Sequence, residues 1–300
     1  MSGNELKWTI IREHDGMSIR NYLQQIQGFS RRMLKTVKFD GGKILVNGFV
    51  QKVNFGLSAG DALHVQFPQE TVGDNIKPED MELTIVYEDA FIIVIDKPAG
   101  IPTIPSMNHA SGTIANGLLG YYKKNNIPYT VHIVTRLDVD TSGLVLIAKH
   151  RLSHSLLSVS QKSGKIKRKY KAVIEGYLTK KDGTIDAPIA RKENSIIERT
   201  VTETGKRAVT HYKVICELLN HSLIEIELET GRTHQIRVHF SHFARPIAGD
   251  DLYGGSTEKI TRQALHCFEL SVEHPSTKEI MSFQAPLLED MTRLIKTETI

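Results

Sequence analysis

Residues 132–148 have the sequence HIVTRLDVDTSGLVLIA, and the rest of the chain is organised around them. Two apolar segments rich in β-branched residues flank a polar centre that ends in glycine. This pattern predicts a strand, an exposed turn and a second strand. Because Leu144–Ala148 shows no alternation of apolar and polar residues, we expect the second strand to lie inside a sheet.

The predicted turn carries a carboxylate, Asp138, with Arg136 two positions before it. Thr141, Ser142 and Gly143 are typical of turns, and glycine permits backbone angles that other residues resist. A loop held at both ends by buried strands would position the carboxylate as a nucleophile requires. On spacing alone, a turn-capping Asp138 paired with Arg136 at the surface fits equally well.

The segments Thr135-Arg136-Leu137-Asp138 and Thr141-Ser142-Gly143-Leu144 resemble the signature of RluA-type RNA pseudouridine synthases, His-Arg-Leu-Asp-x-x-Thr-Ser-Gly. The resemblance implies that Asp138 is the catalytic residue. It also implies that Arg136 enters the space left when the target uridine leaves its stack. Position 135 is Thr here, where the family usually has His, so this neighbour offers a hydrogen bond but no titratable group.

A second motif follows the alternating segment Leu223–Thr230, which predicts an antiparallel strand with one wet face. Residues 231–239, GRTHQIRVH, resemble the family motif Gly-Arg-Thr-His-Gln-[Ile/Leu]-Arg-Val-His and are expected to open a helix. The resemblance implies a salt bridge from Arg237 to the catalytic aspartate, and substrate contacts from Arg232, His234 and Gln235.

The histidines of this region do not form a metal-binding pattern. His234, His239 and His242 share a helix face only in part, and no cysteine or carboxylate joins them. We therefore expect no metal. A rigid loop, DKPAGIP at residues 96–102, resembles the Lys-Pro-x-Gly loop of the family, although Ile104 stands where a His often precedes the last proline.

Residues 162–171 form the most basic window, with no acid among them. A solubilising loop is the usual explanation of such a run. Here Tyr170 lies among the cations, at the start of a predicted strand that ends at Tyr177. In sites that bind single-stranded nucleic acid, cations typically bind the phosphates and a neighbouring aromatic ring stacks on a base. By resemblance Tyr170 packs on the target base and Lys169 contacts the substrate, while a core tyrosine remains the alternative. The expected RNA-binding cations of this run are Lys165, Lys167 and Arg168.

Residues 15–67 predict two short helices followed by hairpins. Asp15 or Ser18 is expected to cap the first helix and Ser30 the second. Together with the Val-Asn-Gly turn at residues 46–48, this order resembles the S4 RNA-binding domain. A solvated basic helix face is the ordinary alternative. The apolar faces are predicted to be Ile19, Leu23 and Ile26 in the first helix and Met33, Leu34 and Val37 in the second, and the expected RNA-binding residues are Arg31, Arg32, Lys35 and Lys38.

Length, charge and composition limit the possible number of domains and the possible location of the protein. The 300 residues carry a formal net charge of +4 and suit one large domain or two unequal ones. Two distant cysteines, Cys216 and Cys267, predict buried thiols in a reducing compartment. No apolar run approaches membrane-spanning length, so we expect a cytoplasmic protein that does not enter a membrane, and a monomer.

We therefore predict an α+β protein with the pseudouridine synthase fold, a mixed and largely antiparallel central sheet with flanking helices. The expected parts are an S4-like domain at residues 1–67, a linker at 68–80 and a catalytic domain at 81–300, in which Ile196–Val201 continues the sheet. The predicted activity is isomerisation of uridine in structured RNA, ribosomal RNA being favoured over transfer RNA, without a cofactor. The alternative is a catalytically inactive RNA-binding or ribosome assembly protein on the same fold.

Overall fold

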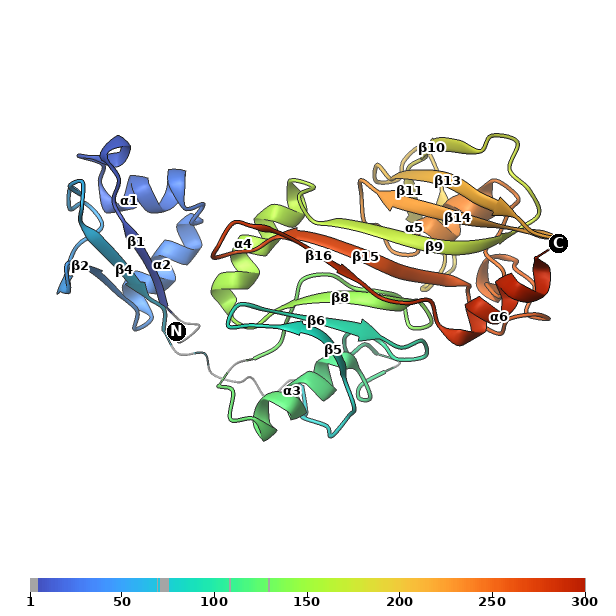
Figure 1. Cartoon of the computed structure of the whole chain (residues 1–300), viewed down its shortest axis with the longest axis horizontal. Helices are drawn as coiled ribbons and strands as arrows, with labels where there is room; N and C mark the ends of the chain where they lie inside the picture. The colour runs from blue at the N-terminus through green and yellow to red at the C-terminus, as the bar shows by residue number, and fades with distance from the viewer. Residues whose placement is uncertain (1–4, 69, 71–75, 108, 129, 300) are drawn as a thin grey trace.

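The computed structural model describes residues 5–68, 70, 76–107, 109–128 and 130–299 (Figure 1). A four-stranded antiparallel sheet with the order β1-β4-β2-β3 occupies residues 5–66. A ten-stranded sheet follows from residue 84 onward and lies to one side of the small sheet. The first sheet and its helices comprise β1 (Glu5–Thr9), η1 (Arg12–His14), α1 (Ile19–Asn21), η2 (Tyr22–Ile26), α2 (Arg31–Phe39), β2 (Lys43–Val46), β3 (Phe49–Val50) and β4 (Ala62–Gln66).

Local signals explain the elements of this small unit. Ser18 and Ser30 cap α1 and α2, since each hydroxyl accepts a hydrogen bond from the backbone N–H three residues later. Asn47 and Gly48 both have positive φ, as a two-residue hairpin turn between β2 and β3 requires. The prediction for Ile26 was wrong: the chain forms a π-helical turn in η2, which changes the helical phase and leaves Ile26 exposed.

The large sheet has the order β10-β13-β14-β9-β15-β8-β6-β5, with β16 added on β15 and β7 on β8. Among its pairings only β15 with β8 is parallel. Its elements are β5 (Thr84–Glu88), β6 (Ile92–Lys97), α3 (Ile114–Lys124), β7 (His132–Ile133), β8 (Ser142–Ala148), α4 (Arg151–Lys162), β9 (Lys167–Glu175), β10 (Asp182–Asp186), β11 (Ile189–Arg191), β12 (Arg199–Val201), β13 (Val209–Glu217), β14 (His221–Leu228), α5 (Gln235–His242), η3 (Asp251–Tyr253), β15 (Leu265–Glu273), β16 (Ile280–Gln284) and α6 (Glu289–Glu298).

The core of the large sheet is the pair of strands β6 and β8. Ile92–Ile95 and Leu144–Ala148 are completely buried, which confirms the interior position expected for an unbroken apolar run. Gly143 has φ 107°, and a Cβ at this position would lie 2.2 Å from the carbonyl oxygen of Cys267 on β15. The motif therefore needs glycine both for its backbone angles and for the close approach of β15.

The segment between the two sheets contacts the large one where it is described. The carboxylate of Glu70 pairs with His132 Nε2 at 2.6 Å, and Glu79 accepts a hydrogen bond from the N–H of Gly112 at 2.9 Å. Residues 69 and 71–75 of the predicted linker lie outside the described residues. The division into domains at residues 67 and 80 stays a prediction.

Three further expectations differ from the structure. Cys216 is exposed because a register shift between Val214 and Cys216 interrupts the alternation of β13. Within the predicted strand Ile196–Val201, only β12 is formed, and it pairs with β11 in a separate two-stranded sheet. The helix α6 was not predicted, although Glu289 and Asp290 in its first turn and Lys296 in its last match the helix dipole.

None of the described helices has the length and apolar content to cross a membrane.

A buried ammonium group joins β6 to the Asp138 turn. Lys97 is fully buried, and its Nζ donates to the carbonyl oxygens of Pro98, Ile101 and Val139 at 2.7–2.8 Å. Burial lowers the pKa of Lys97 to about 7, while the carboxylates of Asp140 and Asp138 oppose that shift. The three N–H groups of the protonated form match the three carbonyl acceptors.

Replacing Lys97 should therefore loosen this turn. Lys97→Met removes a costly buried charge but leaves three carbonyl groups without their donor, so we expect the free energy of unfolding to fall by about 1–3 kcal/mol. Urea denaturation measures the change. Lys123→Met, at an exposed position of α3, is the matched control and should stay within roughly 0.5 kcal/mol of the parent. Equal midpoints for both variants would show that Lys97 does not support the turn.

Candidate active site

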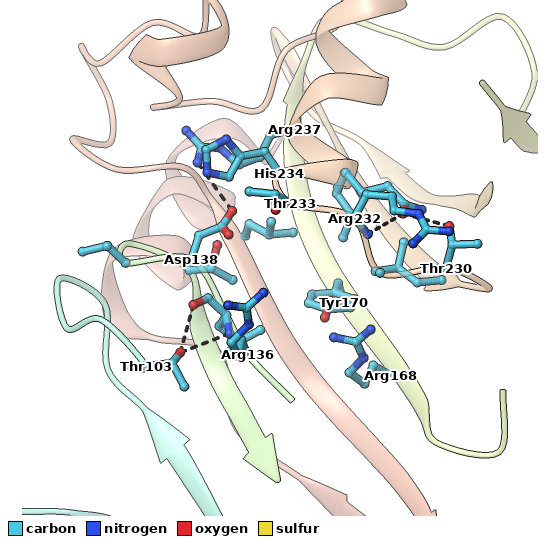
Figure 2. Close-up of a pocket in the computed structure, with 18 of the residues that line it drawn as sticks. Thr103, Arg136, Asp138, Arg168, Tyr170, Thr230, Arg232, Thr233, His234 and Arg237 are labelled. Atoms are coloured by element: carbon cyan, nitrogen blue, oxygen red, sulfur yellow. Dashed lines mark hydrogen bonds and ion pairs between the residues drawn. The ribbon is translucent and has the colours of Figure 1, made fainter. Parts of the chain in front are cut away.

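A cleft of about 1120 Å³ lies where the Asp138 turn, the start of β9 and the start of α5 meet. Figure 2 shows Asp138 and Arg136 on one side and Arg232 and Thr230 on the other, with Tyr170 and Arg168 between them. Cations outnumber acids around the cleft, so it suits an anionic substrate. The cations that line it are Arg136, Lys162, Lys167, Arg168, Arg232 and Arg237, and the acids are Asp138, Asp140, Glu229 and Asp251.

The backbone of residues 137–141 is held from several directions. The Thr103 hydroxyl donates to the carbonyl of Leu137 at 2.9 Å. Lys97 and the N–H of Gly100 both donate to the carbonyl of Val139. On the other side, Arg262 Nη1 donates to the carbonyl of Asp140 at 3.1 Å, and Gln263 Nε2 donates to the Thr141 hydroxyl at 3.2 Å. These contacts place Asp138 at the cleft with 27% of its side chain exposed.

Arg237 divides its hydrogen bonds between two carboxylates. Its Nη1 faces Asp138 Oδ2 at 3.5 Å, as Figure 2 shows, so the predicted pair is present. Its Nε and Nη2, however, donate to the two oxygens of Asp250 at 2.7 Å each. Asp250 and not Asp138 is therefore the main partner of Arg237, because the fully buried Asp250 takes the bidentate position. Burial disfavours the charge, but Asp250 outweighs it and raises the pKa of Arg237.

His234 is held by a tyrosine that the sequence motifs did not single out. Its Nδ1 lies 2.8 Å from the Tyr253 hydroxyl, which also accepts a hydrogen bond from the backbone N–H of Arg199 at 2.9 Å. Burial lowers the pKa of His234, against the opposite effect of Asp138, so the ring is neutral at pH 7. His234 has φ 57°, a left-handed conformation that costs about 1–3 kcal/mol and clusters at functional sites.

Tyr170 lines the cleft although its side chain is 3% exposed. Burial raises the pKa of its hydroxyl, which stays protonated. The strand β9 begins at Lys167, earlier than predicted. Successive side chains of the basic run therefore point to opposite faces of the sheet, so Arg168 and Tyr170 share one face and Lys169 lies on the other. Lys169 pairs with Glu269 at 2.9 Å and is not part of the cleft lining, so the structure gives no support to its predicted contact with the substrate, which stays a prediction.

Gln235 is among the residues that line the cleft, and its amide is bonded within the protein. It is 3% exposed, its Nε2 donates to Val209 and Thr210, and its Oε1 accepts from Thr230 and from the N–H of Arg232. Those four bonds use the capacity of an amide. Gln235 thus closes the turn that presents Arg232, and its contact with a substrate stays a prediction.

The remaining predicted residues lie at exposed positions. Arg136 and Arg232 stand at the rim of the cleft, and the Arg232 Nε donates to the carbonyl of Arg207 at 2.9 Å. Lys165 pairs with Glu273 at 3.3 Å and Lys167 with Glu227 at 3.5 Å, exposed pairs that are readily exchanged for phosphate. On the small unit, the cations of α2 are all exposed, and they are Arg31, Arg32, Lys35 and Lys38.

No metal-binding cluster occurs among the described residues. Of the three histidines considered, His239 is buried, with one ring nitrogen near the Thr210 hydroxyl and the other near the carbonyl of Ala187, both at 2.9 Å. The chemistry that the cleft offers is that of one positioned carboxylate, an adjacent guanidinium and a neutral imidazole. Such a set can form a bond to carbon or move a proton.

Comparison with known proteins gives one consistent result. Residues 91–242 match the family model described as RNA pseudouridylate synthase, and both sequence motifs lie inside this range. The chain is 49% identical to the uncharacterized RNA pseudouridine synthase YjbO of Bacillus subtilis, over 94% of this chain and 99% of that one. It is 39% identical to the ribosomal large subunit pseudouridine synthase D of Pseudomonas aeruginosa, over 85% and 83%. The solved structure of human RNA pseudouridylate synthase domain containing 1 has the same fold, with a TM-score of 0.58 at 22% identity over 73% of this chain and 95% of that one.

The pair between Arg237 and Asp250 makes a prediction about stability. Arg237→Ala leaves the Asp250 carboxylate buried without its partner, and we expect the free energy of unfolding to fall by roughly 3–5 kcal/mol. Chemical denaturation measures the loss. Arg168→Ala, at the same cleft but partly exposed, should cost much less. A denaturation midpoint for Arg237→Ala that equals that of Arg168→Ala would contradict the assignment.

Proposed function

Because the chain belongs to the RNA pseudouridylate synthase family and is therefore an RNA-modifying isomerase, we propose that it converts specific uridines of large-subunit ribosomal RNA to pseudouridine, with Asp138 as the catalytic carboxylate. The observation that carries the proposal is the turn of residues 137–141. Hydrogen bonds from four separate side chains, Lys97, Thr103, Arg262 and Gln263, hold it beside a cationic cleft.

The reaction needs only groups of this kind. The N1–C1′ bond of uridine breaks, the uracil turns, and C5 bonds to C1′. The hydrogen at C5 leaves as a proton and N1 becomes protonated, so the product is an isomer and no redox partner is required. A single carboxylate serves this reaction, whereas glycosidases use two. Asp138 acts as nucleophile or base, and Arg237 supports its charge.

The other cleft residues have roles in binding. Uridine within a folded RNA must leave its stack, at a cost of a few kcal/mol, before it reaches Asp138. Arg136, exposed at the rim two residues before Asp138, is placed to occupy the vacated position. Tyr170 supplies an aromatic surface for the base. Arg168, Arg232 and Lys167 contribute positive charge for phosphates.

We also propose that residues 1–67 are an S4-like RNA-binding domain, joined through residues 68–80 to the catalytic domain at 81–300. Support comes from the serine-capped helix α2, whose exposed side carries four cations. A second RNA-binding module suits a long structured substrate, since both modules gain only when the RNA reaches both. Ribosomal RNA, on which the Pseudomonas relative acts according to its name, meets that condition.

The first test concerns Asp138. Asp138→Asn should abolish tritium release from 5-[³H]uridine-labelled ribosomal RNA, because forming the C5–C1′ bond expels that hydrogen. RNA affinity, measured by filter binding, should remain nearly unchanged, since neutralising an acid eases repulsion from phosphate. Asp251→Asn, another acid at the cleft, is the control for the charge change. Tritium release by Asp138→Asn at the parental rate would refute the assignment.

The second test concerns α2. The double variant Arg31→Glu/Lys35→Glu should raise KM for ribosomal RNA and leave kcat unchanged at saturating RNA. If two phosphate contacts are lost, the slope of log K against log salt should become shallower by about 1.4–1.8. Lys123→Glu/Lys124→Glu on α3 makes the same charge change at another exposed site. An identical salt slope for both double variants would show that α2 does not bind the RNA.

A further inference from the structure

We propose that the tip of the β11–β12 hairpin, residues 192–198, is an apolar contact for unpaired bases of the RNA beside the target uridine. This inference rests on the proposed function and extends the substrate site to a part of the chain outside both sequence motifs. The feature behind it is a pair of adjacent isoleucines at the tip. Ile196 is 78% exposed and Ile197 is 48% exposed.

Hydrogen bonds within the tip fix its conformation. The Ser195 hydroxyl accepts hydrogen bonds from the N–H groups of Ile197 and Glu198, at 3.3 and 2.9 Å. Lys192 Nζ pairs with Glu198 Oε1 at 2.7 Å, and the backbone N–H of Lys192 donates to the carbonyl of Glu198 at 3.1 Å. Asn194 has φ 59°, a left-handed conformation that asparagine adopts more readily than most residues. A built turn therefore presents the isoleucines to solvent.

The hairpin is anchored to elements that form the cleft. Ile189 of β11 and Val238 of α5 belong to one small buried cluster, and Figure 1 shows β11 beside α5. Nearer the tip, the backbone N–H of Arg199 donates to the Tyr253 hydroxyl at 2.9 Å. Ile197 itself lines the cleft that contains the catalytic turn. The tip is thus a fixed part of the cleft edge.

The charges of the tip favour bases over phosphates as the groups that it meets. Residues 191–199 contain three cations and two acids, so their net charge is +1. They are Arg191, Lys192, Arg199, Glu193 and Glu198. Lys192 is paired with Glu198, and Arg199 Nη1 donates to the carbonyls of Ile197 and Glu198 at 2.9 and 3.0 Å. With these cations bonded inside the tip, its outward surface is mainly aliphatic. Aliphatic side chains are among those that proteins place beside unstacked bases.

The reaction produces base faces that such a surface can cover. When the target uridine leaves its stack, the bases on either side of it lose a neighbour. Each then exposes an apolar face to water, and burial of that face against an aliphatic side chain is favourable. Contacts of this kind release no counterions, so they add affinity without adding salt dependence. The tip would therefore favour uridines whose neighbours are unpaired.

The test uses full-length protein and 5-[³H]uridine-labelled large-subunit ribosomal RNA. Ile196→Ala/Ile197→Ala should raise Kd, measured by filter binding, about tenfold because apolar contact is lost. It should lower kcat/KM for tritium release by the same factor. The slope of log K against log salt should equal that of the parent, since no phosphate contact is removed. Ile196→Leu/Ile197→Leu keeps the apolar surface and should stay within about threefold of the parental Kd.

A matched control separates this contact from a general effect of exposed apolar residues. Ile215 and Leu219 are 48% and 55% exposed and lie outside the cleft lining. Ile215→Ala/Leu219→Ala should keep the parental Kd and kcat/KM. The denaturation midpoints of all the variants should match that of the parent, because the changed side chains are exposed. Lower affinity at an unchanged midpoint then reports a lost contact with RNA.

The outcomes are distinct. Equal Kd values for Ile196→Ala/Ile197→Ala and the control would overturn the proposal, and so would a raised Kd with a shallower salt slope, which would indicate a phosphate site. Light scattering that shows a dimeric parent and a monomeric Ile196→Ala/Ile197→Ala would assign the tip to a contact between two copies of this chain and would also overturn it. RNA binding without tritium release by the parent would instead overturn the proposed function, while the comparison of Kd values would still test the tip.

Discussion

The attachment of residues 137–141 to their surroundings is the constraint on which the rest of the site depends. A turn on the protein surface is ordinarily mobile. Here the strand β8 continues from it into the core, and four side chains from two other segments bond to it. Lys97 links the turn to the neighbouring loop, because its buried nitrogen donates to Val139 in the turn and to Pro98 and Ile101. Asp138 consequently stays partly exposed at the cleft, as do Val139 and Asp140.

Electrostatics then determine what that carboxylate meets. Arg237 and Asp250 form a nearly neutral buried pair, and the guanidinium offers Asp138 a single nitrogen. His234 adds a neutral imidazole, since burial lowers its pKa. The net positive charge of the cleft comes from exposed or partly exposed residues farther out, such as Arg136, Arg168 and Arg232. The buried charges at the centre of the cleft are thus paired with one another, whereas the exposed cations lie where phosphates can reach them.

Much of this could be predicted from the sequence, because it depends on local patterns. An unbroken apolar run predicted β8, and serine caps predicted α1 and α2. Two motifs predicted the family and the pair of Asp138 and Arg237, and the basic run indicated Tyr170. The wrong expectations depend on relations that a local pattern does not contain. Lys169 was assigned by resemblance alone, and because β9 starts three residues earlier than expected, Lys169 lies within the strand on the face opposite Tyr170. The hydrogen-bond partners of Gln235 and Asp250 lie far away in the sequence or outside any local motif, so they could be seen only in three dimensions.

The departure at position 135 can now be judged on physical grounds. Thr135 is 1% exposed, its hydroxyl accepts the N–H of Leu146 at 2.9 Å, and its own N–H donates to the carbonyl of Leu146. The side chain therefore closes the turn onto β8 and does not reach the cleft lining. What this position needs is a small acceptor that fits beside the strand, and a titratable ring is not required. This structural role explains the departure at position 135 without requiring an inactive protein.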